Sequence, residues 1–353
     1  MSTVCLHIGA MKSGTSFIQR VLSQNKQQLG ESGHLFPGRR WRDQVLAVEE
    51  ILDAGPKGKQ RTKGAWNDLT AEINAFTGAG VIVSMEGMSL APSRDAQRIV
   101  ESFPGHKVRI VVTARDLARV VPAQWQESIK NGATVDFGRY LAVASAPGAR
   151  KLAAARPFWG PQDVPRILRT WRPLVGPEDL VLVTVPPRGA APDELWNRFR
   201  DAAGLPPGEY DLDVRGNESL GVHSAELLRR LNRELDANGS HRVRQTVKQS
   251  LAKGLLAPHA ASEPAIEVPE EYRAWVRQTA DSLADEIADI NPKVIGDLDD
   301  LRVPQWKDYR GGRLAGMRNL RHYADNGPSD AELLEVAEDA LVGLTKLIAE
   351  KYR

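Results

Sequence analysis

A short stretch near the start of the sequence, HIGAMKSGTSF, combines the residue types that bind phosphate groups. Its two glycines permit a tight backbone path, its lysine supplies a mobile positive charge, and its hydroxyl side chains can donate hydrogen bonds. The stretch follows an apolar run and precedes a helical pattern, so the free N–H groups of the first helical turn would face a bound anion. A simpler alternative is that a hydroxyl only caps the helix. We predict phosphate contacts from Lys12, Ser13, Gly14, Thr15 and Ser16.

The position of the lysine distinguishes this stretch from an ATP-binding loop. That loop has the pattern G-x-x-x-x-G-K-[ST], in which the lysine follows the second glycine and the hydroxyl binds Mg²⁺. Gly9 and Gly14 have the required separation, but Thr15 stands where the lysine belongs, and Lys12 precedes Gly14. The spacing therefore favours a group-donor ligand whose critical charge lies beside the part of the loop that precedes Gly14.

A second cationic residue, Arg115, ends the apolar run VRIVVTAR and is followed by Asp116. In open α/β sheets, ligands bind at the carboxyl ends of the strands, which is where both this arginine and the first loop are expected. Taken alone, an arginine at a strand end is more often part of a surface ion pair. A ligand-binding role for Arg115 therefore has to be supported by other features of the sequence.

The segment from Lys12 to Ser16, placed after the first strand, resembles the 5′-phosphosulfate loop of the sulfotransferases that use 3′-phosphoadenosine 5′-phosphosulfate (PAPS). The pair Arg115 and Asp116 resembles the 3′-phosphate site of the same family. The resemblance implies that Lys12 contacts the 5′-phosphate and the bridging oxygen, which gains charge as the sulfonate leaves, and that Arg115 contacts the 3′-phosphate. It also implies PAPS as co-substrate, adenosine 3′,5′-bisphosphate as product, and no metal.

The arginine segment departs from the family pattern at two positions. Ala123 stands where the family carries a serine, eight residues after Arg115, and Leu117 stands where it carries a proline. The contact that the serine would make is therefore missing. Arg119 and Gln124 are the candidates to replace it.

Further stretches resemble bacterial members of the family, namely LGESGHLFPG, PFWGPQDVPRILRTWRP, VTVPP followed by DELWNRF, and NESLGVHSAELLRRLN. The resemblance covers residues 1–235 and weakens beyond them. We therefore expect a sulfotransferase α/β core with its PAPS-binding loop in residues 1–235. Residues 236–353 would form a mostly helical region packed on that core as one continuous domain. The acceptor would be a hydroxyl or amine of a small molecule, a carbohydrate or a lipid.

Transfer to a hydroxyl also needs a general base. Glu86, in VIVSMEGMSLAP, stands just beyond the carboxyl end of a predicted strand, in a position similar to that of bases in several family members. We predict that Glu86 is the base, flanked by Ser84 and Ser89, which could contact donor or acceptor. The alternatives for Glu86 are a helix N-cap network and an ion pair with a nearby arginine.

The remaining chemically versatile residues give weaker signals. No two of the seven histidines lie at metal-ligand spacing and the chain has one cysteine, so we predict no metal site. His7 and His34 could approach the site, although a satisfied structural role is expected for both. Trp125 is expected in the core, with stacking on adenine or shaping of an acceptor pocket as the alternative. The basic segment 241–253 is most simply a solvated helix face, with closure over the 3′-phosphate as the alternative.

Four short apolar runs rich in β-branched residues predict buried parallel strands, at residues 4–8, 81–85, 108–113 and 180–185. Helical patterns lie between them, as in Ile18, Val21, Leu22 and Leu29. This alternation, with the resemblance, predicts an α/β fold, a P-loop-type doubly wound parallel sheet with helices on both faces and a helical C-terminal part. A stripe near the C-terminus is expected to pack in the core, formed by Leu333, Val336, Ala340, Leu344 and Ile348.

Composition limits the classes of partner. A net charge of +2 over 353 residues gives no bulk case for nucleic-acid binding, so any anion site must be local. We expect Cys5 to be a buried thiol. No stretch approaches the roughly 20 apolar residues that a membrane span needs, and the N-terminus has no basic region typical of a signal peptide. These features predict a cytoplasmic protein without stable membrane insertion, of unspecified oligomeric state.

Two other functions fit part of the pattern. A P-loop kinase or NTPase with an atypical loop would need Mg²⁺ and an acidic metal ligand, for which Asp116 is the candidate. A non-catalytic nucleotide-binding protein is the other alternative, suggested by the alanine at position 123.

Overall fold

The structure is a computed structural model that describes residues 2–53, 62–214, 219–236, 243, 246–260, 262–303 and 327–351. The chain divides into two compact units. The first comprises Met1–Leu117, Trp159–Gly216 and Gln278–Val303, and the second comprises Ala118–Phe158, Asn217–Arg277 and Pro304–Arg353. The division expected from the sequence, at residue 235, stays a prediction.

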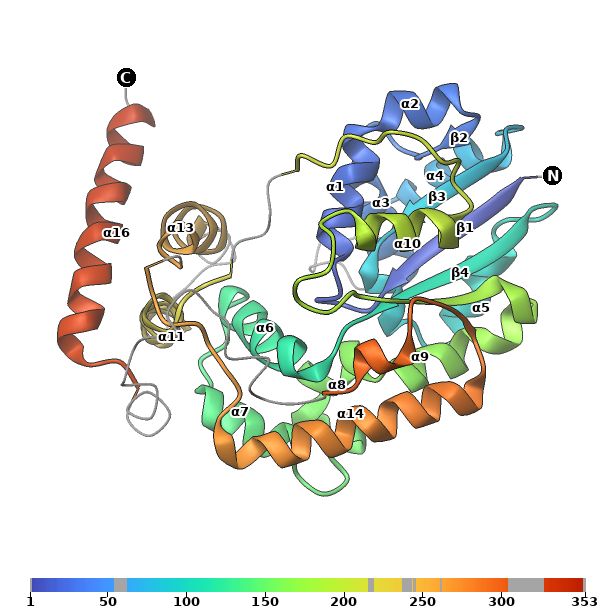
Figure 1. Ribbon diagram of the computed structural model, residues 1–353. Coiled ribbons are helices and arrows are strands. Elements are labelled where there is room, and N and C mark those ends of the chain that lie inside the picture. The colour runs from blue at the N-terminus through green and yellow to red at the C-terminus, as the bar shows by residue number, and fades with distance from the viewer. Residues whose placement is uncertain are drawn as a thin grey trace. The chain divides into compact units, whose positions relative to one another are not determined.

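The first unit is built on a six-stranded parallel sheet with the strand order β2-β3-β1-β4-β5-β6 (Figure 1). The strands are β1 (Thr3–Gly9), β2 (His34–Leu35), β3 (Gly80–Ser84), β4 (Lys107–Ala114), β5 (Leu180–Thr184) and β6 (Lys293–Ile295). The four runs predicted from β-branched residues are confirmed as β1, β3, β4 and β5. Because β1 lies between β3 and β4, the strand order reverses beside the end of β1, which is where open α/β sheets bind ligands.

Alternate residues along each strand enter two different cores, as the pleat of a strand requires. On one face, Leu6 packs in a core that includes Ile167 of helix α9 (Val164–Trp171). On the other face, Cys5 packs with Ile18 of α1 (Thr15–Gln24) and Trp196 of α10 (Glu194–Ala203). Both faces are therefore covered by helices, which confirms the predicted doubly wound α/β class. Burial raises the pKa of the Cys5 thiol to about 12, as expected of a core cysteine.

Further helices of the first unit connect strands, among them α2 (Lys26–Glu31), α3 (Trp41–Ile51), α4 (Ala65–Asn74), the 3₁₀ turn η2 (Glu86–Leu90) and α5 (Ser93–Glu101). The 3₁₀ turn η8 (Leu298–Leu301) follows β6. The segments that continue across the border of the two units are α6 (Leu117–Lys130), α8 (Arg156–Gln162) and α14 (Glu270–Ile290). The apolar face predicted for α1 is confirmed, because Ile18, Val21 and Leu22 are fully buried.

The second unit is helical. It contains α7 (Phe137–Ala144), α11 (Val222–Asp236), a π-helical stretch (Val247–Leu256), α13 (Ala257–His259) and α16 (Asp330–Lys351). In α16, Leu333, Val336 and Ala340 are buried as predicted. The prediction is wrong for Ile348, whose side chain is 57% exposed. It lies at the far end of the helix, past the last of these buried positions. Among the described residues, no helix combines the length and the apolar character that a membrane crossing requires.

Candidate functional site

The predicted phosphate loop leaves the carboxyl end of β1 and leads directly into α1. Gly14 precedes α1 with φ 84°, and a Cβ atom at this position would lie 2.5 Å from Cδ2 of Leu195. Gly9 has φ 124°, and a Cβ there would lie 3.1 Å from Cβ of Ser89. Both positions therefore require glycine. Lys12 adopts a left-handed conformation as well, with φ 62°, so the loop turns sharply around this residue.

The N-terminus of α1 has no side-chain cap. The N-cap residue is Gly14, which has no side chain to accept a hydrogen bond, and the first turn carries no acidic residue. The carbonyl of Gly14 accepts from the N–H groups of Phe17 and Ile18, at 3.0 and 3.2 Å. The sequence alternative that a loop hydroxyl caps this helix is therefore wrong. The positive end of the helix dipole is left for an anion.

The side chain of Ser13 points into the protein. Its Oγ is buried, donates to the carbonyl of Ala10 and lies 2.6 Å from Oγ1 of Thr113, at the end of β4. Because the hydroxyl proton of Ser13 is used in this way, the group of Ser13 that can donate to a phosphate is its backbone N–H. Thr15 is almost fully buried, whereas Ser16 is partly exposed.

The first loop and Arg115 leave the same edge of adjacent strands. Gly9 pairs in register with Val112, and the N–H of Ala10 donates to the carbonyl of Thr113 at 2.6 Å. Two residues later, Arg115 follows the end of β4 with a partly exposed side chain. This placement meets the expectation that both cations occupy one edge of the sheet.

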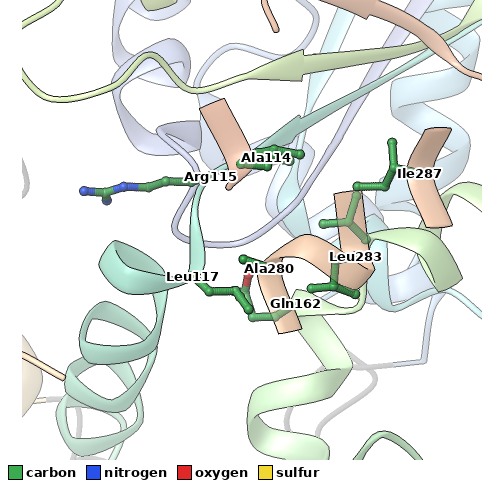
Figure 2. Close-up of a pocket in the computed structure, with 9 residues that line it drawn as sticks. Ala114, Arg115, Leu117, Gln162, Ala280, Leu283 and Ile287 are labelled. Carbon is green, nitrogen blue, oxygen red and sulfur yellow. The ribbon is translucent and has the colours of Figure 1, made fainter. Parts of the chain in front are cut away.

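A small apolar cavity of about 20 Å³ lies beside Arg115. Its walls include Gln162 of α8, Leu283 and Ile287 of α14, and Leu301. Figure 2 shows the guanidinium of Arg115 pointing away from Leu283 and Ile287. Since this volume holds about one water molecule, the cavity is not a nucleotide site, and the charged end of Arg115 lies on its outer side.

Glu86 begins the turn η2, two residues after β3 ends at Ser84. Its Oε2 accepts a hydrogen bond of 2.6 Å from the side-chain amide of Gln19, which also donates to the carbonyl of Ser84 at 3.3 Å. Gly9 lies against this turn, because a Cβ on Gly9 would be 3.3 Å from the carbonyl oxygen of Glu86. The candidate base and the phosphate loop are therefore neighbours, and the described partner of the Glu86 carboxylate is a neutral amide.

The two serines that flank Glu86 are used internally. Ser84 is fully buried, its Oγ lies 2.8 Å from Nδ1 of His7, and its carbonyl accepts from the indole N–H of Trp41 at 2.9 Å. Ser89 donates its hydroxyl to the carbonyl of Glu86 at 2.7 Å. Both hydroxyls are therefore engaged within the protein, and the expectation that they contact donor or acceptor stays a prediction.

The two histidines considered from the sequence, His7 and His34, are structural, as expected. His7 is fully buried between β3 and β4, with Nε2 at 3.2 Å from Oγ1 of Thr113, and burial lowers its pKa to about 3. His34 is buried, and its Nδ1 lies 3.0 Å from the carbonyl of Ser32. His7 is therefore a neutral imidazole at any physiological pH.

The candidates to replace the missing serine lie in α6, in the second unit. Gln124 is buried and donates to the carbonyl of Pro157 at 3.3 Å, and Arg119 is partly exposed. Their role stays a prediction. Trp125 is buried, donates to the carbonyl of Val135 at 3.0 Å and contacts the ring of Phe137, which confirms its place in the core.

The basic segment 241–253 lies partly outside the described residues, which omit 241, 242, 244 and 245. Its remaining part enters the π-helical stretch, where Lys248 pairs with Glu127 at 3.1 Å. In the described part of the chain, no group of three or more His, Cys, Asp or Glu side chains is arranged to hold a metal ion.

Three residues of the site were not identified from the sequence. Gln19 binds Glu86, Thr113 binds Ser13, and Gln162 donates from its amide to the carbonyl of Met11 at 2.9 Å, next to Lys12. Each partner lies 67 to 151 residues away in the chain. The one available hint was a polar residue, Gln19, within the apolar face of α1.

Comparison with known proteins adds a likeness of fold. No protein-family model matches the chain, and no curated protein matches it. Among solved structures, it is similar to the crystal structure of a sulfotransferase from Alicyclobacillus acidocaldarius, with 15% sequence identity and a TM-score of 0.42. The match covers 69% of this chain and 94% of that one. At such a TM-score, function has to be argued from the site residues themselves.

Proposed function

We propose that this chain is a sulfotransferase that moves a sulfuryl group from PAPS to a hydroxyl or amine without a metal ion. The observation that carries the proposal is the loop itself. A lysine lies inside the turn that precedes an uncapped helix, at the sheet edge where β1 and β4 end. The acceptor class proposed is a small molecule, a carbohydrate or a lipid, and the proposed compartment is the cytoplasm.

The donor would bind across the two strand ends. Lys12 and the backbone N–H groups of residues 13–16 would hold the 5′-phosphosulfate, and Arg115 would hold the 3′-phosphate. Hydrogen bonds to charged groups contribute about 1.5–3 kcal/mol each. A few of them are sufficient for micromolar affinity, which corresponds to about −8 kcal/mol.

PAPS supplies an activated sulfuryl group, whose bond from sulfur to the bridging oxygen breaks as the acceptor oxygen bonds to sulfur. Lys12 would donate to the bridging oxygen and stabilise the electron pair that stays there. Glu86 would take the proton of the acceptor hydroxyl, and its hydrogen bond with Gln19 would hold the carboxylate in place. Since such transfer depends on positioning and electrostatics, the rigid turns around Gly9 and Gly14 support this assignment.

The proposal is tested by thermal shift with two nucleotides. We expect adenosine 3′,5′-bisphosphate to stabilise the protein in EDTA, and Mg-ATP to have little effect. Stabilisation by Mg-ATP alone would instead favour a kinase or NTPase with an atypical loop.

Turnover is tested by transfer from labelled PAPS. The acceptors are a panel of hydroxyl compounds, amines, carbohydrates and lipids, and mass spectrometry identifies any sulfated product. Transfer to at least one acceptor supports an enzyme. Tight binding of adenosine 3′,5′-bisphosphate with no transfer to any acceptor would support the non-catalytic alternative.

A further inference from the structure

A chain of buried neutral groups lies beneath the proposed site and crosses three strands. Oγ of Ser84 in β3 lies 2.8 Å from Nδ1 of His7 in β1, and Nε2 of His7 lies 3.2 Å from Oγ1 of Thr113 in β4. Oγ1 of Thr113 lies 2.6 Å from Oγ of Ser13, which donates to the carbonyl of Ala10. The four side chains are fully buried. We call these four residues the relay.

The carbonyl at its end fixes the direction of every hydrogen bond in the relay. A carbonyl only accepts, so the single proton of Ser13 goes to Ala10, and toward Thr113 the Oγ of Ser13 can only accept. The carbonyl of Gly9, 3.1 Å from Oγ1 of Thr113, is a second acceptor, so the one proton of Thr113 is used toward the loop whichever of the two oxygens receives it. Thr113 must therefore accept from His7. His7 then carries its proton on Nε2, and its Nδ1 accepts from Ser84.

The relay also connects the three residues proposed to act on the donor and acceptor. Lys12 is next to Ser13, Glu86 follows Ser84 by two residues, and Arg115 follows Thr113 by two. We infer that Thr113, through its hydroxyl and the Nε2–H tautomer of His7, is a positioning residue that holds the phosphate loop, the Glu86 turn and the Arg115 strand end in one arrangement. This inference rests on the proposed function for its readout of nucleotide affinity.

Three variants test the role of the hydroxyl. Thr113→Val keeps the shape and removes the hydroxyl, and Thr113→Ser restores the hydroxyl. Thr70→Val is the matched control, because Thr70 donates within α4, to the carbonyls of Trp66 and Asn67, in a part of the fold that carries none of the site residues. The probe is adenosine 3′,5′-bisphosphate, titrated by calorimetry into proteins whose unfolding transitions show that they are folded.

We expect Thr113→Val to weaken binding about tenfold, which corresponds to about 1.4 kcal/mol, because the loop and the strand ends lose the hydroxyl that holds them in one arrangement. Thr113→Ser should recover most of that affinity, and Thr70→Val should leave it unchanged. Equal affinity of folded Thr113→Val and the wild type would overturn the inference. Equal loss in Thr113→Val and Thr70→Val would also overturn it, because the effect would then follow stability alone.

A spectroscopic measurement tests the relay without any ligand. Two-bond ¹⁵N–¹H correlations of the His7 imidazole should show Nε2 protonated and Nδ1 unprotonated, and Thr113→Val should alter the Nε2 resonance. Protonation at Nδ1 would contradict the relay. If the wild type binds no adenosine 3′,5′-bisphosphate, the proposed function fails and the tautomer alone decides the inference.

Discussion

Two polar clusters lie at the carboxyl edge of the same sheet, and they differ in whether their buried groups are neutral or charged. At the ends of β1 and β4, the buried groups are the neutral hydroxyls and imidazole of the relay, and the cations Lys12 and Arg115 are partly exposed. At the ends of β5 and β6, Arg198 lies among carboxylates instead. It bonds to Asp300, to Glu194 at 2.8 Å and to the carbonyl of Thr184 at 3.0 Å.

The charged groups of the second cluster form hydrogen bonds and ion pairs with one another. Burial alone would lower the pKa of Arg198, but its hydrogen bonds to Asp300 and Glu194 outweigh burial and raise it. Thr184 completes the cluster by donating to Asp300 at 2.7 Å. A closed ion cluster of this kind holds β5, α10 and η8 together. The partly exposed cations of the loop after β1 and of the end of β4 are the charges that we propose bind an external anion.

Removal of the loop lysine is expected to have the largest effect on the proposed site. Lys12→Ala should lower the rate of sulfuryl transfer by about 100- to 1,000-fold, as loss of an oxyanion donor does. The fold should persist, because the side chain is partly exposed. Transfer rates from labelled PAPS measure the effect, with the exposed Lys63→Ala as control. Near-normal turnover in Lys12→Ala would refute the assigned role.

The role proposed for Glu86 can be tested separately from donor binding. Glu86→Gln should lower kcat about 100-fold, in the range for loss of a general base. It should leave the affinity for adenosine 3′,5′-bisphosphate unchanged, because the glutamine keeps the shape of the turn. Steady-state kinetics and calorimetry together give the two quantities. A variant that loses affinity but keeps kcat would assign Glu86 to binding instead.

The closed cluster should respond in stability rather than in binding. Arg198→Met leaves Asp300 without its main partner and should lower the free energy of unfolding by about 2–3 kcal/mol, near the range for a buried ion pair. Arg200→Met, which breaks a more exposed pair with Asp201, should cost about 1 kcal/mol or less. Urea unfolding measures both. An Arg198→Met variant of normal stability with weakened nucleotide binding would reverse the roles of the two clusters.

The relay predicts the sign of a pH effect. Burial lowers the pKa of His7 from its ordinary 6.5 to about 3, so the unfolded chain binds a proton that the folded chain excludes. His7 therefore stabilises the fold fully above pH 6.5, and this contribution is lost as the pH falls toward 3. Between pH 7 and pH 5 the loss should be about 2 kcal/mol. Urea unfolding of wild type and His7→Asn at both pH values isolates it, and identical pH dependence would contradict a neutral His7.

Much of the fold could be predicted from local patterns. Runs of β-branched residues predicted β1, β3, β4 and β5, because a parallel strand that is covered on both faces is apolar along its whole length. The two remaining strands, His34–Leu35 and Lys293–Ile295, were missed because two or three residues carry no pattern. The exposure of Ile348 was also missed, because helical periodicity says which residues share a face and not where the neighbouring helix ends.

The site was predictable in its residue types but not in its hydrogen bonds. The loop could be found because its glycines, lysine and hydroxyls are contiguous. The inward turn of Ser13 could not, because its partner Thr113 is 100 residues away and is an ordinary strand residue. The same reason hid the bond between Gln19 and Glu86, which spans 67 residues. Tertiary hydrogen bonds of this kind depend on strand order and register, which no local pattern encodes.

The most direct test is calorimetric titration of adenosine 3′,5′-bisphosphate into the wild type and Lys12→Ala, in EDTA. We expect micromolar binding to the wild type, near −8 kcal/mol, and binding at least about tenfold weaker to the variant. Equal affinities, or binding only when magnesium is restored, would contradict a metal-free anion site built around this lysine.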